Sequence, residues 1–414
     1  MNGRAIILPT LSALSLLLLC GAATAGSLNP PLGPVQGSMK PLNEVEPRTA
    51  VGPATTPGDA TSLYIISQPG SYYLTGNLTG NSNHENVIMI LADGVTLDLN
   101  GFTIDCAGSQ VGIEATPSRR AITIVNGTIA SAGTTNLSLD GVTGVHLRAI
   151  RSINSPEASI LVGNSALIEH CAVVGGTAGF TAGRASTIRD CTSSNTSSNG
   201  FYAISSTIDR CTARSAGEYG FSISESSVAT NCIAEECQYG FGGTLSSRFV
   251  HCTAFSNTFD GFTAGFGSVV DRCTAEENGD DGITANDRAT VLNSNATRNA
   301  RHGIVAETKA TITGNSASNN GLAAGTFGAG IFVQGSDNKI DGNSVISNEW
   351  GIRAEAVGNL IIRNTATGNV TFNYSTVAGN SWGTTVIATT TVAQNGSGGF
   401  GGLGATDPFA NLSY

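Results

Sequence analysis

The sequence predicts an all-β solenoid, a chain wound into stacked coils of about 21 residues, and three observations predict it. A glycine followed by phenylalanine or isoleucine recurs every 20 or 21 residues, and a column of cysteines advances in step with it. The composition, with 53 glycines in 414 residues and only 12% charged residues, suits short strands and turns better than long helices. The glycines are Gly179, Gly200, Gly220, Gly240, Gly261, Gly282 and Gly303, and the column contains Cys171, Cys191, Cys211, Cys232, Cys252 and Cys273.

Residues 1–25 have the features of a secretory signal peptide. Arg4 supplies the positive start, an apolar stretch follows, and Ala23-Thr24-Ala25 offers a cleavage site. A lipid anchor on Cys20 is the alternative, which the large Leu19 before it disfavours. We therefore expect a mature protein that is secreted, either extracellular, periplasmic or at the cell surface.

Residues 26–62 contain seven prolines and are expected to form an extended linker or arm. The repeat domain is expected over residues 63–375, because a coil of this length buries its apolar face only against its neighbours. Each regular coil reads as three short strands with small corners, which predicts a parallel β-helix. Residues 376–414 are expected to form a C-terminal cap and tail, since an uncapped coil exposes strand edges.

A column of asparagines lies five residues after the cysteine column. We expect asparagine at these corners because it tolerates left-handed backbone angles and because stacked amides bond from coil to coil. The column contains Cys237, Asn257, Asn278, Asn299, Asn320, Asn348 and Asn369.

The composition argues against a nucleic-acid-binding protein, a membrane-spanning protein and a disulfide-linked protein. The net charge is −10 and lysine and arginine form no cluster, so we expect no nucleic-acid partner. No segment of the mature chain is apolar enough to span a membrane. Cysteines stacked in register lie about 4.8 Å apart, whereas a disulfide prefers Cβ atoms about 3.8 Å apart, so buried free thiols are favoured over disulfides.

The corner just before each Gly-Phe or Gly-Ile strand varies from coil to coil and is the predicted binding edge. Aromatic residues make up only 6% of the chain, yet three of them gather at this corner, and the one long insertion, 321–329, opens there as well. Aromatic faces beside carboxylates are typical of a sugar-binding groove, and corner packing is the alternative. The predicted substrate-binding residues are Tyr219, Tyr239, Arg301, Glu349, Trp350 and Arg353.

Three successive coils place Asp260, Asp280, Asp281 and His302 at this corner. Side chains on neighbouring coils lie roughly 5 Å apart, so the carboxylates should perturb one another's pKa. Such an arrangement is what acid/base hydrolysis of a glycoside requires. Two alternatives stay open: these residues simply make good turns, or the carboxylates hold a calcium ion. We expect no other cofactor and no metal motif.

The Gly-Phe/Ile and asparagine columns, over residues 87–369, resemble those of the right-handed parallel β-helix proteins of the pectate-lyase-like superfamily. The resemblance implies a single-stranded right-handed parallel β-helix. The order Asp260-Gly, Asp280-Asp281, His302-Gly is similar to the polygalacturonase site. It implies Asp280 as general acid, Asp260 and Asp281 as activators of water, and His302 as the residue that orients the site.

Two functions from different classes remain. The first is a polysaccharide-binding protein that is a hydrolase or lyase acting on a uronic-acid-type polymer. The second is a non-catalytic surface, matrix or adhesion protein that uses the solenoid as a rigid scaffold.

Overall fold

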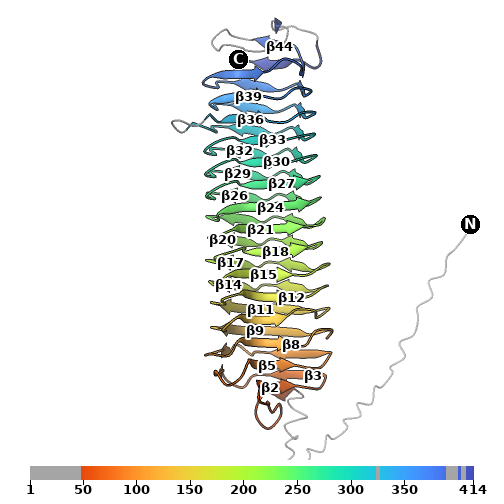
Figure 1. The fold of residues 1–414 in the computed structure, drawn as a ribbon, viewed down its shortest axis with the longest axis vertical. Helices are drawn as coiled ribbons and strands as arrows, with labels where there is room; N and C mark the ends of the chain where they lie inside the picture. The colour runs from red at the N-terminus through yellow and green to blue at the C-terminus, as the bar shows by residue number, and fades with distance from the viewer. Residues whose placement is uncertain (1–47, 323–326, 388–399, 402–406) are drawn as a thin grey trace, which may run out of the picture. The chain divides into compact units, whose positions relative to one another are not determined.

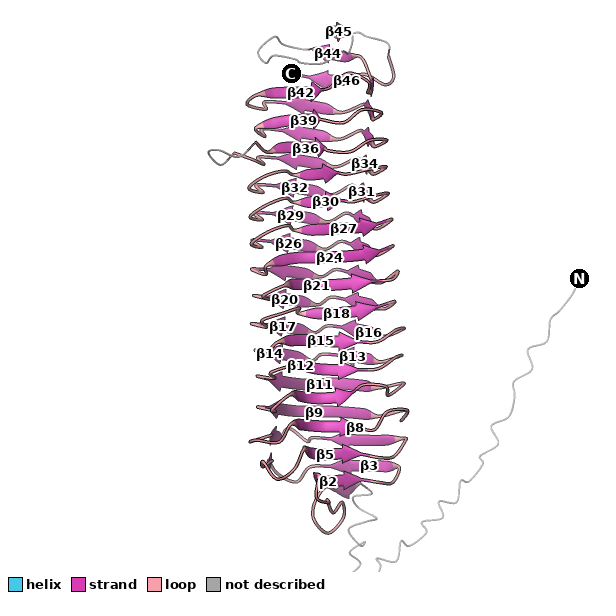
Figure 2. Cartoon of the chain, in the orientation of Figure 1, coloured by secondary structure: helices cyan, strands magenta, loops and turns pink. Residues whose placement is uncertain are grey.

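The computed structural model describes residues 48–322, 327–387, 400–401 and 407–414. The described part consists of strands and turns without any α-helix, and so it holds no helix that could cross a membrane (Figures 1 and 2). The strands pair in parallel from coil to coil. The predicted fold class, a single-stranded right-handed parallel β-helix, is confirmed. The predicted signal peptide and most of the predicted linker lie outside the described residues.

One strand from each coil joins a 15-stranded parallel sheet. Its strands are β2 (Ser62–Ile66), β5 (Asn86–Ile90), β8 (Val111–Ala115), β10 (Thr135–Leu139), β12 (Ala158–Val162), β15 (Ala178–Ala182), β18 (Phe201–Ile204), β21 (Tyr219–Ser224), β24 (Tyr239–Leu245), β27 (Phe262–Phe266), β30 (Ile283–Ala285), β33 (Ile304–Ala306), β36 (Ala329–Val333), β39 (Trp350–Ala354) and β42 (Phe372–Thr376).

The other two strands of each coil belong to a 31-stranded sheet made of two parallel columns. The long strands β9 (Thr123–Ala130) and β11 (His146–Ile153) run through both columns and join them. The first column also contains β1 (Thr49–Ala50), β3 (Gly70–Tyr73), β6 (Val95–Asp98), β13 (Leu167–Glu169), β16 (Thr187–Arg189), β19 (Thr207–Asp209), β22 (Val228–Thr230), β25 (Arg248–Val250), β28 (Val269–Asp271), β31 (Thr290–Leu292), β34 (Thr311–Thr313), β37 (Lys339–Asp341), β40 (Leu360–Ile362) and β43 (Ser381–Trp382). The second contains β4 (Leu78–Thr79), β7 (Thr103–Asp105), β14 (Ala172–Val174), β17 (Thr192–Ser194), β20 (Thr212–Arg214), β23 (Ile233–Glu235), β26 (Thr253–Phe255), β29 (Thr274–Glu276), β32 (Asn295–Thr297), β35 (Ser316–Ser318), β38 (Ser344–Ile346), β41 (Thr365–Thr367), β44 (Thr385–Ile387), β45 (Phe400–Gly401) and β46 (Asn411–Ser413).

The predicted phenylalanine column forms the centre of the core. Phe180, Phe201, Phe221, Phe241 and Phe262 are paired in register along the 15-stranded sheet and are fully or almost fully buried. Their rings stack with centroids 4.7 to 4.9 Å apart. The spacing of the rings is therefore the spacing of the strands, and each phenylalanine inside the stack has an aromatic neighbour on both sides.

The cysteine column is buried, and its thiols are free. All eight cysteines of the described part are free and buried. Within the column the backbone N–H of Cys171 donates to Sγ of Cys191 at 3.4 Å, and Cys252 does the same to Cys273. The thiols thus act as small side chains that also accept a bond from the coil before.

The asparagine column is a continuous ladder of buried amides. Asn299 shows the pattern: its Oδ1 accepts bonds from the backbone N–H and the Nδ2 of Asn278, and its Nδ2 donates to Oδ1 of Asn320 and to the carbonyl of Ala275. The predicted coil-to-coil bonds are confirmed. The predicted left-handed backbone is wrong for these residues, because the positive φ falls one position earlier, for example at Arg298 with φ 54°. The chain therefore turns at the residue that precedes each asparagine. The asparagine itself contributes the hydrogen bonds between coils and does not adopt the left-handed conformation.

Replacing Asn299 by alanine is expected to lower the free energy of unfolding by about 2–3 kcal/mol, since it leaves buried donors and an acceptor without partners. Urea unfolding followed by circular dichroism measures the loss. Asn295→Ala removes an outward-facing amide from the same coil and should change stability by less than about 0.5 kcal/mol. Equal effects of the two substitutions would contradict the ladder as a source of stability.

The C-terminal strand β46 lies between β41 and β44, although β44 precedes it in the chain. Asn411 enters the ladder there: its Oδ1 accepts from the backbone N–H of Asn364 at 2.9 Å, and its Nδ2 donates to carbonyl groups on both sides. The hydroxyl of Tyr374 bonds to the carbonyl groups of Asn364 and Leu412. The end of the chain therefore takes part in the ladder itself.

Candidate functional site

The predicted corner is a straight column along one edge of the 15-stranded sheet. Tyr219 pairs with Tyr239, and Trp350 pairs with Phe372. Between these aromatic ends, backbone bonds link the coils of Asp260, Asp281 and His302 in sequence. Residues 20 or 21 apart in the sequence are thus stacked as neighbours.

The three aspartates form a compact cluster. Each offers a carboxylate oxygen, and these oxygens lie within 4.8 Å of one another. Oδ1 of Asp260 accepts the backbone N–H of Asp281 at 3.2 Å, and Oδ1 of Asp281 accepts the backbone N–H of His302 at 2.9 Å. Asp260 and Asp281 therefore each fasten the next coil, which is a structural role that turn-forming residues would also have.

Arg301 joins the outer side of the cluster. Its Nη1 lies 3.5 Å from Oδ1 of Asp280 and 3.4 Å from Oδ2 of Asp281. The side chain of Asp280 is 38% exposed, whereas that of Asp281 is 8% exposed. The cluster therefore has one carboxylate that faces solvent and one that is nearly buried, with a positive charge already beside both.

Burial shifts the pKa values of the cluster. Loss of hydration raises the pKa of Asp281 to about 7, helped by the nearby Asp260 and Asp280 charges and opposed by the bond from His302 and by Arg301. Burial also raises the pKa of Asp260. At neutral pH Asp281 is therefore still partly protonated, whereas an isolated aspartate would have lost its proton.

His302 is buried and neutral. Burial, with the charges of Arg301 and Arg353, lowers the pKa of its imidazole to about 3. Nδ1 accepts the backbone N–H of Ala329 at 2.9 Å, so the ring carries its proton on Nε2, and the ring stacks on Phe332 with centroids 4.4 Å apart. In the described part of the chain, no bond joins this ring to the carboxylates. The ring instead anchors the insertion where it rejoins the sheet at β36.

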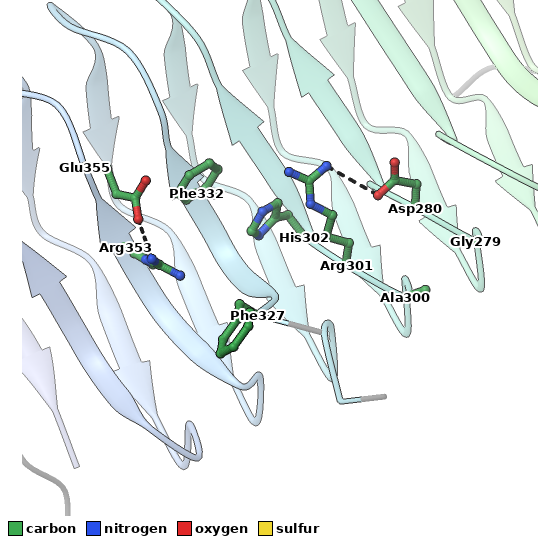
Figure 3. A pocket seen from close by; sticks show the side chains of 9 residues that line it. All are labelled: Gly279, Asp280, Ala300, Arg301, His302, Phe327, Phe332, Arg353 and Glu355. Atoms are coloured by element: carbon green, nitrogen blue, oxygen red, sulfur yellow. Dashed lines mark hydrogen bonds and ion pairs between the residues drawn. The ribbon is translucent and has the colours of Figure 1, made fainter. Parts of the chain in front are cut away.

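A cleft of about 480 Å³ opens beside the cluster. Figure 3 shows the side chains that line it. Asp280, Arg301 and His302 line one side, and Phe332, Arg353 and Glu355 line the other. Phe327, from the described end of the insertion, is 69% exposed and closes the cleft below.

Arg353 is held by aromatic rings. Its guanidinium lies 4.7 Å from the ring centroid of Trp350 and 5.8 Å from that of Phe332, and it pairs with Glu355. Trp350 and Phe332 belong to a small apolar cluster with Val305 and Ala329 on the outer face of the sheet. The cleft thus combines two guanidinium groups, aromatic faces and carboxylates.

Two family models match the chain. One, described as the right handed beta helix region, matches residues 111–265, and the other, described as periplasmic copper-binding protein (NosD), matches residues 252–399. The chain is a right-handed parallel β-helix repeat protein. None of the curated proteins compared with it matches significantly.

Several solved β-helix structures are similar to this β-helix protein at low identity. The A-module of mannuronan C-5 epimerase AlgE4 from Azotobacter vinelandii is 15% identical, with a TM-score of 0.40 over 84% of this chain and 91% of that one. The catalytic domain of a GH87 alpha-1,3-glucanase is 12% identical, with a TM-score of 0.45 over 70% and 62%. The tailspike of Escherichia coli bacteriophage HK620 is 13% identical, with a TM-score of 0.40 over 83% and 71%. These likenesses extend to the fold alone.

The β-helix brings some of the predicted binding residues together and separates others. Arg301 and Arg353 line the cleft. Trp350 packs behind Arg353, and Glu349 accepts the backbone N–H of Gly328 at 3.0 Å, which fastens the insertion. Tyr219 and Tyr239 stack 4.9 Å apart on the other side of the aspartates, and Phe259 extends that stack.

Three residues that line the cleft were not predicted from the sequence: Phe327, Phe332 and Glu355. A signal existed for Phe332, because the residue after the inward Ile331 must point outward from the strand. Its column runs Thr263, Thr284, Val305, Phe332, Arg353 across five coils. Two members of this column, Phe332 and Arg353, line the cleft together with the corner residues Asp280, Arg301 and His302.

Proposed function

We propose that this β-helix protein binds an acidic polysaccharide of the uronic-acid type in the cleft between Arg301 and Arg353, and cleaves it with the adjacent aspartate cluster. The observation that carries the proposal is the combination, in one open cleft, of two guanidinium groups and exposed aromatic rings beside a carboxylate cluster that holds a proton near neutral pH.

The binding part follows from charge and shape. A guanidinium forms strong, oriented bonds to a carboxylate such as that of a uronic acid. The Arg353 side chain is already ordered by two rings and Glu355, so a ligand would cost it little further ordering. The ring of Phe327, which is largely exposed, offers a flat apolar surface to the C–H face of a sugar.

The chemical part follows from the cluster. Within the cluster, Asp280 is the aspartate that lines the cleft, and Asp281 is the one whose pKa is raised to about 7. In hydrolysis the glycosidic C–O bond breaks and the departing oxygen takes, through Asp280, the proton that Asp281 held. The attacking water then returns a proton to the deprotonated Asp281 or to Asp260. His302 stacks on Phe332 and so holds the opposite wall of the cleft in place. A lyase would instead remove a carbon-bound proton and leave a double bond, so the product separates the two reactions.

Arg353→Ala is expected to weaken binding of hexagalacturonate about 10- to 100-fold, because a charge-assisted bond is lost. Calorimetric titration measures the affinity, and the loss should shrink as salt screens the pair. Arg214→Ala is the matched control: it removes an exposed guanidinium paired with Glu235 on β20, away from the cleft. Equal affinities of the wild type and Arg353→Ala for the acidic oligosaccharide would refute the binding proposal.

Copper binding, which the printed description of NosD suggests, does not fit the described residues. Copper favours histidine, cysteine and methionine ligands. Within residues 252–399 the sequence has one histidine, two cysteines and no methionine. The cysteines are in the buried column, and Nδ1 of His302 is already bonded to Ala329. The described aspartate cluster offers only oxygen ligands and already contacts the cation of Arg301.

The scaffold function is the second candidate, favoured by the bonds through which Asp260 and Asp281 fasten successive coils. In that case the carboxylates stabilise the fold, and the cleft binds a ligand without cleaving it.

We also propose export from the cytoplasm, which the predicted signal peptide and the periplasmic description of NosD support. Detection of the mature protein without residues 1–25 outside the cytoplasm would test this.

A further inference from the structure

A second hollow lies on the same outer face of the 15-stranded sheet, on the other side of the aspartate cluster. It has a volume of about 390 Å³ and extends over strands β21, β24 and β27. Its floor is formed by Gly242 and Gly243, and its walls include Tyr219, Thr263, Phe266 and Asn286. None of the residues of the first cleft belongs to it.

Glycine at position 242 is what gives the hollow its shape. A Cβ atom there would lie 2.6 Å from Cε1 of Tyr219, so the tyrosine ring occupies the space above this residue. The ring of Tyr219 also stacks on the ring of Tyr239, which belongs to the same strand as Gly242. At the opposite wall Phe266 is 43% exposed, with the guanidinium of Arg288 5.0 Å from its ring centroid. The hollow therefore lies between two aromatic side chains.

The polar groups of the hollow have no partner within the described chain. The hydroxyls of Ser222, Thr244, Thr263 and Tyr219 and the side-chain amide of Asn286 are only partly buried or exposed and make no side-chain hydrogen bond there. None of the described residues that line the hollow carries a carboxylate. Unpaired hydroxyl and amide groups between aromatic faces match the hydroxyls and C–H faces of a sugar ring, whereas the first cleft offers guanidinium groups to a carboxylate.

We propose that this hollow is a second sugar subsite, which binds a neutral sugar residue through its ring face and hydroxyls. The proposal rests on the proposed function in one respect: the same polymer is taken to run from the first cleft, past the aspartate cluster, to the hollow. Thr263 is in register with Thr284, whose hydroxyl donates to Asp260 at 3.3 Å, so the hollow adjoins the cluster. The two sites meet at the coil of β30, which carries Asp280 of the first cleft and Asn286 of the hollow. Thr263 in the hollow lies four coils of about 4.8 Å from Arg353 in the cleft. The polymer it fits is therefore a heteropolymer with neutral and acidic residues a few units apart.

The test is titration of the full chain with cellohexaose, mannohexaose, xylohexaose, galactohexaose and hexagalacturonate. The wild type should bind at least one neutral hexasaccharide. Phe266→Ala and Thr263→Val should each weaken that binding about tenfold. Leu245→Ala is the matched control, since Leu245 is paired with Phe266 and 49% exposed but does not line the hollow. Arg353→Ala should leave the neutral affinity within about twofold, because the first cleft is not used.

The outcomes separate the two proposals. Failure of every neutral hexasaccharide to bind, or unchanged affinities in both Phe266→Ala and Thr263→Val with hexagalacturonate still bound, overturns the subsite and leaves the first cleft standing. Neutral binding that depends on Phe266 without any binding of hexagalacturonate supports the hollow and overturns the acidic substrate. Urea midpoints of the variants should equal that of the wild type, which ties any loss to the hollow itself.

Discussion

Asp281→Asn is expected to slow cleavage of the polymer at least about a hundredfold while leaving the folded protein as stable as the wild type, or more stable, above the Asp281 pKa of about 7. The amide can still accept the backbone N–H of His302 but cannot carry the proton of the cluster. Loss of activity together with a gain in stability is typical of a site whose charges serve function.

The pH dependence of stability follows from the raised pKa. The folded protein keeps a proton on Asp281 that the unfolded chain has lost, so this group's contribution to stability is complete below about pH 4 and disappears as pH rises to about 7. His302 acts in the opposite direction: with its pKa lowered to about 3, its contribution is complete above about pH 6.5 and is lost as pH falls toward 3. The advantage of Asp281→Asn should therefore appear near pH 8 and disappear near pH 4.

Asp287→Asn is the control for this substitution, because Asp287 lies in the same coil beyond β30 and outside the cluster. Urea midpoints of the three proteins across the pH range, with cleavage rates at each pH, measure both effects. A variant that is destabilised at every pH and loses activity only in proportion to its unfolded fraction would show that Asp281 serves the fold alone.

Phe241→Ala is expected to lower the free energy of unfolding by about 3–5 kcal/mol. The side chain is fully buried, stacks on Phe221 and Phe262 at 4.8 and 4.7 Å, and meets the edge of Phe249 at 5.6 Å. In a solenoid, stability is the sum of coils and of contacts between neighbours, so the vacancy weakens two interfaces at once.

Denaturant unfolding measures this loss, and hydrogen exchange locates it. Exchange should quicken most in the amides of β21, β24 and β27, the strands on either side of the vacancy. Phe266→Ala, which truncates the same residue type on the outer face, should cost less than about 0.5 kcal/mol. A loss of under 1 kcal/mol for Phe241→Ala would mean that the stacked rings do not dominate the core.

Much of the fold could be predicted from the sequence because the repeat imposes one environment on each column. Each residue of the phenylalanine column lies between its counterparts in the coil before and the coil after. A period of about 21 residues is therefore enough to place its side chain in the core. The ladder at Asn299 followed for the same reason. Asn411 could not be found this way, because it lies 47 residues from its partner Asn364 and β44 comes before it in the chain.

The site was predictable in position but not in detail. The sequence placed Asp280 and Asp281 at one corner, yet adjacent residues on a strand end face different surroundings, and only the structure shows Asp281 buried and Asp280 in the cleft. The role of Phe332 depends on the path of the insertion, which no repeat encodes. The imidazole of His302 accepts a bond from Ala329 at the end of the insertion. The repeat could not predict this contact, because the insertion interrupts the regular spacing of the coils.

We propose above that the cleft beside Asp280 binds and cleaves an acidic polysaccharide. Incubation of the wild type with polygalacturonate, pectin and alginate, with and without Ca²⁺, followed by measurement of new reducing ends and of unsaturated products, tests this proposal most directly. We predict new chain ends from at least one acidic polymer, and none with Asp281→Asn. Failure of the wild type to bind or cleave any of the three polymers under either condition would contradict the claim.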